Sequence, residues 1–366
     1  MIEINRPTLV VDKEVCIQNI ERMATKVRLN KMRFRPHFKT HQSAQIGEWF
    51  RMYGVEAITV SSVRMAEYFA SNGWDDITIA FSVNILEVEA INRLAKSVKL
   101  NIVVENRESV KILANRVSAK MGVYIKIDTG YHRTGISASQ TGAIDSILED
   151  LSKNKKLTFK GFLVHTGHTY QAQSTHEIFN FHFDALLKTK NLRNQYQKDY
   201  PQLEVSLGDT PSASICGNFT GVDELRPGNF VFYDLMQHHL GVCHLEDIAV
   251  RMVCPVVAKH PSRNEIVIYG GAIHFSKESI LNTDGKPLYG RIILRKGKEK
   301  VLLDTKNYLA KLSQEHGIIR VMQNQLKEIN VGDLVEILPV HSCLTANLMG
   351  QYLSTDGKII SMMPHF

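Results

Sequence analysis

The chain contains no run of about 18 apolar residues, and its first residues lack the basic start and apolar core of a secretory signal. A helix that spans a membrane needs such a run, because its backbone must cross an apolar layer about 30 Å thick. The sequence therefore indicates neither a membrane anchor nor export. We expect a cytoplasmic protein with no membrane partner.

Cysteines are also few, odd in number and widely scattered: Cys16, Cys216, Cys243, Cys254 and Cys343. Such a set argues against a framework of disulfide bonds. We expect most of these cysteines to be small buried apolar side chains. Cys343 lies close to a histidine in the sequence and is considered separately below.

The excess of basic over acidic residues is modest, 44 against 37, which gives a net charge of +7. No long basic run accompanies it, so we expect no nucleic-acid partner. The positive balance instead suits a small anionic cofactor and substrate. Apolar residues make up 44% of the 366 residues, so the chain can bury a core, and its length indicates one large domain and one smaller domain.

Short apolar runs alternate with segments of helical periodicity from residue 8 to about residue 240. "TLVVD" at 8–12 is the first of eight such runs, and the others are equally continuous in their apolar character. Runs of this kind are typical of parallel strands buried on both faces. A doubly wound open sheet is the alternative, but no glycine-rich dinucleotide-binding turn follows the first run. We therefore predict a (β/α)8 barrel of the TIM type over residues 8–240.

After residue 240 the pattern changes to short strands separated by turns, with few helical segments. This pattern predicts a smaller, all-β domain over residues 241–366. We expect residues 1–7 to join that domain as an extra strand.

Polar residues follow several of the predicted barrel strands, at the end where barrels of this type carry their sites. They are Lys39 and His41 after the second strand, Asp128, Arg133 and Gly135 after the sixth, His165 and His168 after the seventh, and "GDTPS" (208–212) after the eighth. Each alone is best explained as a cap or a turn residue. Their convergence at one end of the barrel indicates a functional site.

The "GDTPS" segment has the features of an anion site. It offers backbone N–H groups and hydroxyls directly before a predicted helix, and Pro211 suits the first turn of that helix. In "RPGN" (226–229), a glycine permits a second close approach of backbone to a ligand. A lysine on the same end of the barrel as a phosphate site suggests pyridoxal phosphate, which a lysine holds as a Schiff base.

Six segments carry a resemblance to a known family: "RPHFKTH", "DTGYHRTG", "VHTGHTY", "GDTPS", "ELRPGNFVFYD" and "PVHSCLTANL". With these, the chain resembles the fold-type III pyridoxal-phosphate enzymes, the alanine-racemase-like barrels, and within them the D-threonine aldolase and D-serine dehydratase group. The resemblance implies that Lys39 carries the cofactor and that the active enzyme is a homodimer. It also implies that His165 lies near the cofactor ring. The remaining cofactor-binding residues that it implies are Gly208, Asp209, Thr210, Gly228 and Asn229 around the phosphate, together with Arg133 and Tyr170.

His341 and Cys343 are two residues apart near the end of the chain. In an extended strand both side chains would point the same way and could bind one ion. Imidazole and thiolate together suit zinc better than magnesium or calcium. Spacing alone favours a buried structural pair, but the resemblance implies a metal here, because the dehydratases have His-x-Cys where typical D-threonine aldolases have an aspartate second. We expect zinc, or another divalent metal such as manganese.

Three reactions suit these residues. The favoured one is a lyase reaction that depends on pyridoxal phosphate and a divalent metal and acts on β-hydroxy D-amino acids, as in D-serine or D-threonine dehydratases. The alternative is a D-threonine aldolase, which cleaves its substrate to glycine and an aldehyde with His165 or His168 as the base. A pyridoxal-phosphate-dependent amino-acid racemase is the third, and it would have no role for a metal.

Overall fold

The computed structural model describes residues 3–296 and 299–364. Contacts divide the chain into two compact units. The barrel unit consists of Ile20–Lys39 and Gly47–Phe230. The sheet unit consists of the residues up to Asn19, Thr40–Ile46, and the residues from Val231 onward. No helix in the described part of the chain is long and apolar enough to cross a membrane.

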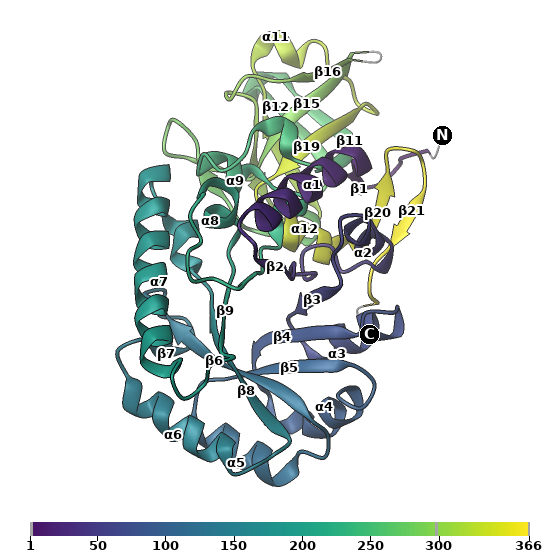
Figure 1. Ribbon diagram of the computed structural model, residues 1–366. Helices are drawn as coiled ribbons and strands as arrows, with labels where there is room; N and C mark the ends of the chain where they lie inside the picture. Colours follow the sequence, from purple (N-terminus) through teal and green to yellow (C-terminus); the bar gives the residue numbers. More distant parts are fainter. Residues whose placement is uncertain (1–2, 297–298, 365–366) are drawn as a thin grey trace. The chain divides into compact units, whose positions relative to one another are not determined.

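The barrel unit is built on parallel strands that form a nearly closed ring (Figure 1). Across the described residues the order is β2 (Arg33–Phe34), β10 (Glu224–Leu225), β9 (Glu204–Leu207), β8 (Leu157–Val164), β6 (Met121–Asp128), β5 (Lys99–Val104), β4 (Asp76–Ser82) and β3 (Ala57–Val60), with β7 (Ile136–Ser137) paired to β6. A single parallel bridge between His37 and Thr59 connects the two ends of this order. The predicted eight-stranded TIM-type barrel is therefore confirmed.

Helices lie outside the barrel strands in Figure 1. They are α3 (Val63–Ser71), α4 (Val88–Leu94), α5 (Arg107–Arg116), α6 (Thr141–Ser152) and α7 (Thr175–Tyr196), with the short α8 (Thr210–Ile215) after β9. Four of them begin at a side chain that accepts a hydrogen bond from the first turn, namely Ser62, Asn106, Ser174 and Asp209. These residue types are preferred there because they satisfy a backbone N–H that has no partner within the helix. The boundary between the two units falls within α1 (Lys13–Leu29) and α2 (Ala44–Arg51).

An aromatic cluster fixes the segment that follows β2. Phe38 is fully buried, and its ring centroid lies 5.0 Å from those of Phe50, Phe69 and Trp74. The Phe38 amide also donates to the carbonyl of Thr59 at 2.9 Å. Side-chain packing and a backbone hydrogen bond therefore both hold the residue next to Lys39.

The sheet unit contains a mixed sheet together with α9 (Leu235–His239), α10 (Ala272–Phe275), α11 (Gln323–Leu326) and α12 (Ser342–Met349). Its strand order is β12 (Glu265–Tyr269), β18 (His316–Arg320), β17 (Tyr308–Leu312), β15 (Gly290–Lys296), β19 (Leu334–Pro339), β11 (Val250–His260), β1 (Thr8–Val11), β20 (Gln351–Ser354) and β21 (Ile359–Ser361), with β16 (Glu299–Leu302) on β15. A smaller β-rich part at the C-terminal end of the chain is therefore confirmed.

The prediction that residues 8–12 form the first strand of the barrel is wrong. β1 pairs antiparallel with β11 and parallel with β20, inside the sheet unit. A central strand of that sheet is buried on both faces, so it has the same continuous apolar character as a barrel strand. The missing barrel strand is β10, which has only the two residues Glu224 and Leu225 and was too short to recognise.

The strand expected from residues 1–7 begins instead at Thr8, while Met1 and Ile2 lie outside the described residues. The division into folding domains at residue 240 stays a prediction.

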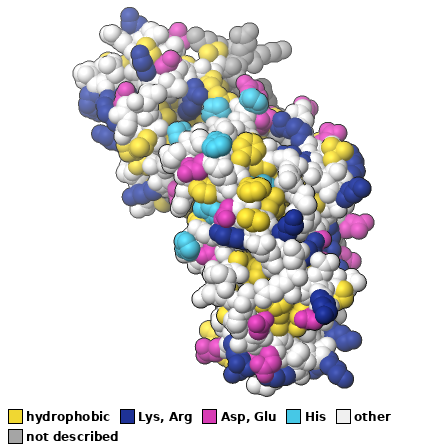
Figure 2. Space-filling view, turned by 60° about the vertical axis from the view of Figure 1, so that its left-hand side comes forward, with side chains coloured by type: hydrophobic (Ala, Val, Ile, Leu, Met, Phe, Trp, Pro, Cys, Tyr) yellow, Lys and Arg dark blue, Asp and Glu magenta, His cyan; other side chains and the backbone are white. Residues whose placement is uncertain are grey.

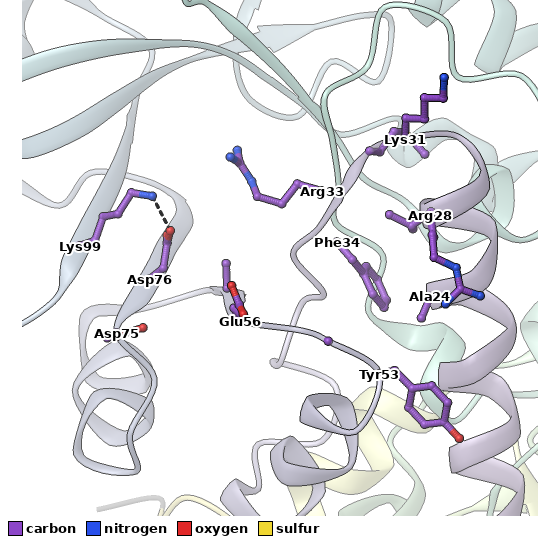
Figure 3. Close-up of a pocket in the computed structure, with 14 residues that line it drawn as sticks. Ala24, Arg28, Lys31, Arg33, Phe34, Tyr53, Glu56, Asp75, Asp76 and Lys99 are labelled. Atoms are coloured by element: carbon purple, nitrogen blue, oxygen red, sulfur yellow. Dashed lines mark hydrogen bonds and ion pairs between the residues drawn. The ribbon is translucent and has the colours of Figure 1, made fainter.

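Charged residues meet at the N-terminal ends of the barrel strands. Glu224 is fully buried, and its Oε2 accepts from Arg33 Nε at 2.5 Å and from Arg35 Nε at 2.6 Å. Arg33 also binds Glu204, and Arg35 binds Asp76 at 2.6 Å. A hollow of about 790 Å³ opens at this end, and Figure 3 shows Arg33 and the Asp76–Lys99 ion pair beside it. Because these charges pair with one another, we assign them a structural role.

This network predicts a loss of stability in acid. Burial acts to raise the pKa of Glu224, but the guanidinium groups of Arg35 and Arg33 outweigh it and lower the pKa to about 2. A carboxyl whose pKa is lowered by folding contributes stability above its unfolded value of about 4.3 and loses it as the pH falls toward 2. We expect Glu224→Gln to lower the free energy of unfolding at pH 7 by about 3–5 kcal/mol, because Arg35 is left buried without its main partner.

Denaturant titration between pH 2.5 and pH 7 tests this expectation. The difference between wild type and Glu224→Gln should shrink as the pH falls. Glu48→Gln is the matched control, because Glu48 pairs with Arg51 on an exposed helix face and its removal should change stability by less than about 0.5 kcal/mol. A pH-independent difference would contradict the account.

Candidate functional site

Lys39 lies in the turn that follows β2, at the C-terminal end of the barrel strands, and its side chain is exposed. The turn is held on both sides, because the His37 amide donates to Pro227 O at 2.9 Å and the Phe38 amide donates to Thr59 O. The segment containing Gly228 and Asn229 therefore lies beside the segment containing Lys39. The structure brings these two predicted parts of the site together.

His165 follows β8 and contacts the turn that follows β9. Its Nδ1 lies 2.6 Å from Gly208 O, so Nδ1 carries the proton and donates it, which leaves Nε2 as an acceptor. Desolvation and the positive charges of Lys126 and Lys39 lower the pKa of His165 well below its usual value. The imidazole is therefore neutral at physiological pH, and the charge of Lys39 acts directly on it.

The turn at Gly208, Asp209 and Thr210 is shaped by close contacts. A Cβ on Gly208 would lie 2.8 Å from Arg226 O, so no other residue fits without displacement. Asp209 begins α8, and its carboxylate accepts from the Ser212 amide at 2.7 Å and the Ser212 hydroxyl at 2.5 Å. The side chain of Asp209 thus stabilises the turn, and it does not itself bind the anion.

Thr210 carries a polar atom that the fold leaves without a partner. Its amide donates to the Tyr170 hydroxyl at 3.1 Å. Its own hydroxyl is buried, and within residues 3–296 and 299–364 nothing forms a hydrogen bond with it. A buried hydroxyl in that state costs about 1–3 kcal/mol, so the position suits a ligand that accepts a hydrogen bond.

His168 and Arg133 are connected through an aromatic residue that sequence reasoning missed. The Tyr131 ring centroid lies 6.0 Å from that of His165, 6.4 Å from that of His168 and 5.0 Å from the Arg133 guanidinium carbon. A Cβ on Gly167 would overlap the Tyr131 ring. The His168 side chain is buried, and burial lowers its pKa, so this histidine is also neutral.

Two cations inside the barrel were missed as well. Lys126 on β6 is buried, and burial together with the charges of Arg226 and Arg133 lowers its pKa well below the usual value. Arg226 is buried and donates to Ser206 Oγ at 2.6 Å and Val164 O at 2.7 Å. Lys126 could have been noticed from the sequence, because it is a lysine in the middle of the apolar run "VYIKID". Burial lowers the pKa of Arg226 only to about 10, so Arg226 stays charged and gives the interior a positive character that suits an anionic cofactor.

The sheet unit holds the predicted metal pair, with a geometry that differs from the expected one. His341 is the residue directly before α12, and Cys343 lies in the first turn of that helix. The two residues are therefore not on one extended strand, and the argument from strand spacing is wrong. Within residues 3–296 and 299–364, no cluster of three or more histidine, cysteine, aspartate or glutamate side chains is arranged to hold a metal.

Both members of the pair have defined partners. His341 Nδ1 lies 3.2 Å from Asp234 Oδ2, and the Cys343 thiol donates to Thr40 Oγ1 at 3.4 Å. Burial acts to lower the pKa of His341, but the hydrogen bond to Asp234 and the negative charge of Cys343 outweigh it and raise the pKa to about 9. Thr40 is the residue that follows Lys39 in the sequence.

Two family models match the chain. The model for the alanine racemase N-terminal domain matches residues 11–235, and the model for a putative serine dehydratase domain matches residues 249–355. The D-serine dehydratase of Dictyostelium discoideum is 28% identical over 98% of this chain and 95% of the relative. The 3-hydroxy-D-aspartate aldolase of Paracoccus denitrificans is 25% identical over 99% of this chain and 92% of the relative.

A solved structure is similar along its whole length. The D-threo-3-hydroxyaspartate dehydratase from Delftia sp. HT23 superposes with a TM-score of 0.90 and 25% identity, over 99% of this chain and 98% of that one. The first family model covers more than half of the chain and includes five of the six segments on which the resemblance was based, while the sixth lies within the match to the serine dehydratase domain. The protein therefore belongs to the alanine racemase N-terminal domain family, as its motifs predicted.

Proposed function

We propose that the protein is a lyase that depends on pyridoxal phosphate and a divalent metal, and that it acts on β-hydroxy D-amino acids by dehydration. One observation carries the proposal: Lys39, neutral His165 and the Gly208–Thr210 turn converge at one end of the barrel. The dehydratase names of the relatives support the lyase class and the D-amino acid substrate.

The barrel residues fit the phosphate of the cofactor. The unpartnered Thr210 hydroxyl can donate to a phosphate oxygen, and the missing side chain of Gly208 leaves room for close approach. Tyr170 positions the Thr210 amide, and Gly228 and Asn229 border the same region through the His37–Pro227 hydrogen bond. Arg133 and buried Arg226 add positive charge that attracts the phosphate.

Pyridoxal phosphate held at this site would supply a ring that takes up electrons released at the substrate Cα. The residues of the chain would do the rest. Lys39 would hold the cofactor, and its amine, when free, would remove the proton from the substrate Cα. His165 keeps its proton on Nδ1 through Gly208, so its ring adds no positive charge next to the lysine.

His341 and Cys343 would hold the metal, most suitably zinc, because zinc accepts nitrogen and sulfur ligands together. With two protein ligands, a metal at this pair would keep open positions for water or for the β-hydroxyl of the substrate, and it would polarise that oxygen. Two variants of the Delftia dehydratase have been solved, one with a histidine and one with a cysteine replaced by alanine, the latter in a metal-free form. Those titles support a metal at the corresponding pair here.

Retro-aldol cleavage is the second candidate function. The aldolase name of the Paracoccus denitrificans relative favours it, and the same lysine, cofactor and metal would serve. His168, buried and neutral beside Tyr131, is then a candidate base for the β-hydroxyl. Racemisation is disfavoured because it requires no metal, so His341 and Cys343 would have no function in it.

We further propose a cytoplasmic homodimer that binds neither nucleic acid nor membrane. The dimer follows from the family resemblance, and an exposed apolar stripe on α7 supports it. Phe179, Phe183 and Leu187 are 44%, 66% and 48% exposed at four-residue spacing, so they share one face of the helix. Figure 2 brings the side of α7 forward and shows hydrophobic side chains gathered there. A second copy of the chain would cover apolar surface of this kind.

The phosphate site is tested by Thr210→Val. Valine keeps the shape but removes the hydroxyl, so we expect the affinity for pyridoxal phosphate to fall about tenfold to a hundredfold, as for one hydrogen bond to a charged group. Stability without cofactor should stay the same or rise, because an unpartnered hydroxyl is lost. Fluorescence titration with pyridoxal phosphate measures the affinity.

Two variants serve as references for that titration. Exposed Thr158→Val should bind the cofactor as wild type does, and Lys39→Ala should lose the visible absorbance of the lysine-bound cofactor. Unchanged affinity in Thr210→Val would remove Thr210 from the phosphate site.

The reaction itself is tested by incubation with D-threonine. Dehydration gives 2-oxobutyrate and ammonia, whereas cleavage gives glycine and acetaldehyde. We expect 2-oxobutyrate as the main product, and we expect a chelator to abolish its formation and zinc to restore it. Glycine as the main product would establish the aldolase, and undiminished activity after complete metal removal would refute the metal requirement.

The homodimer is tested by light scattering on the purified protein. The expected mass is twice the 41.4 kDa of one chain. Phe183→Glu places a charge in the middle of the apolar stripe and should shift the mass toward the monomer. A dimer that persists in this variant would place the interface elsewhere, and a fully active wild-type monomer would contradict the dimer altogether.

A further inference from the structure

Asp234 lies at the start of two helices in the sheet unit and is fully buried. Its Oδ1 accepts from the Gln237 amide of α9 at 3.0 Å. Its Oδ2 accepts from the Ser342 amide at 3.0 Å and the Ser342 hydroxyl at 3.2 Å, both in α12. One carboxylate therefore satisfies backbone N–H groups at the beginning of both helices.

The same Oδ2 lies 3.2 Å from His341 Nδ1. His341 occupies the N-cap position of α12, but its side chain forms no cap hydrogen bond with that helix. Asp234 takes over the capping of α12, so the imidazole does not compete for the Ser342 amide. The hydrogen bond to Asp234 holds the proton on Nδ1 and leaves Nε2 as the ring nitrogen for a ligand.

Such an arrangement has a known consequence for metal sites. A histidine that binds a metal through one ring nitrogen commonly donates the other N–H to a carboxylate, which fixes the ring and makes it a better ligand. Charge also favours the arrangement, because the carboxylate of Asp234 and the thiolate of Cys343 together balance the two positive charges of a zinc ion. Neither effect requires Asp234 to contact the metal.

We propose that Asp234 is the positioning residue of the metal pair, orienting His341 so that Nε2 and the Cys343 sulfur bind one divalent ion. The inference rests on the proposed metal function of His341 and Cys343. Asp234 is thus a third residue, distant in sequence, that acts through His341. Its carboxylate also connects the start of α9 to the start of α12.

The experiment measures zinc affinity directly, by competition with a chromophoric chelator in protein that carries pyridoxal phosphate. Asp234→Asn keeps the size of the side chain and one acceptor oxygen but removes the charge. We expect its zinc affinity to fall about 10- to 100-fold, as for the loss of a carboxylate behind a ligating histidine. The visible absorbance of the cofactor should stay close to that of wild type.

Ser342→Ala is the matched control. It removes the hydroxyl that binds Asp234 Oδ2 but keeps the backbone N–H and the His341 hydrogen bond. A role limited to the contact with the Ser342 hydroxyl would make the two variants alike, whereas a role through His341 predicts a zinc affinity within about threefold of wild type for Ser342→Ala. Equal losses in both variants, or none in Asp234→Asn, would overturn the proposal.

Nuclear magnetic resonance of the wild-type protein loaded with zinc keeps the test decisive if Asp234→Asn does not fold. Nitrogen-15 spectra of labelled histidine should show His341 protonated at Nδ1 and metal-bound at Nε2. The opposite assignment would overturn the role of Asp234. A wild-type protein that binds no zinc would instead refute the proposed metal function, so the two failures are distinguishable.

Discussion

The position of three consecutive residues, Phe38, Lys39 and Thr40, is the constraint on which the site depends. Phe38 is buried among aromatic rings of the barrel unit, and its amide is bonded to Thr59. Thr40 is fully buried in the sheet unit, where it accepts a hydrogen bond from Cys343. Lys39 between them is exposed. Two buried neighbours leave the lysine backbone little freedom, while the side chain can still reach a ligand.

Electrostatics in the barrel follow from burial and not from surface charge. Desolvation is the largest cause that lowers the pKa of His37 and His165, and nearby positive charges lower it further, so both imidazoles are neutral. A neutral His165 can then donate to the carbonyl of Gly208 without adding charge. The interior remains positive overall, which favours a phosphate-bearing cofactor, while the carboxylates at the opposite end of the strands are paired with arginines.

Sequence reasoning recovered the barrel because the barrel depends on local signals, and the same signals are the basis of the predicted site. The continuous apolar runs identify strands buried on both faces, and short motifs identify the turns that follow them. It failed where the deciding interaction is long-range. β1 was assigned to the barrel although its partners lie near residues 250 and 353, and β10 was overlooked because two residues carry no periodicity. Tyr131, Lys126 and Asp234 were missed because their roles come from neighbours on other elements.

By itself the sequence determined the family, since residue identity and local order suffice for this, and on the same basis it predicts Lys39 as the cofactor lysine and His341 and Cys343 as nitrogen and sulfur donors to a metal. Tertiary structure alone decided that Cys343 begins a helix, that Thr210 keeps a buried hydroxyl without a partner, and that Asp234 caps two helices while binding His341. The physical reason is that a hydrogen bond depends on where two groups meet in space. The groups that matter here are separated by up to 303 residues along the chain.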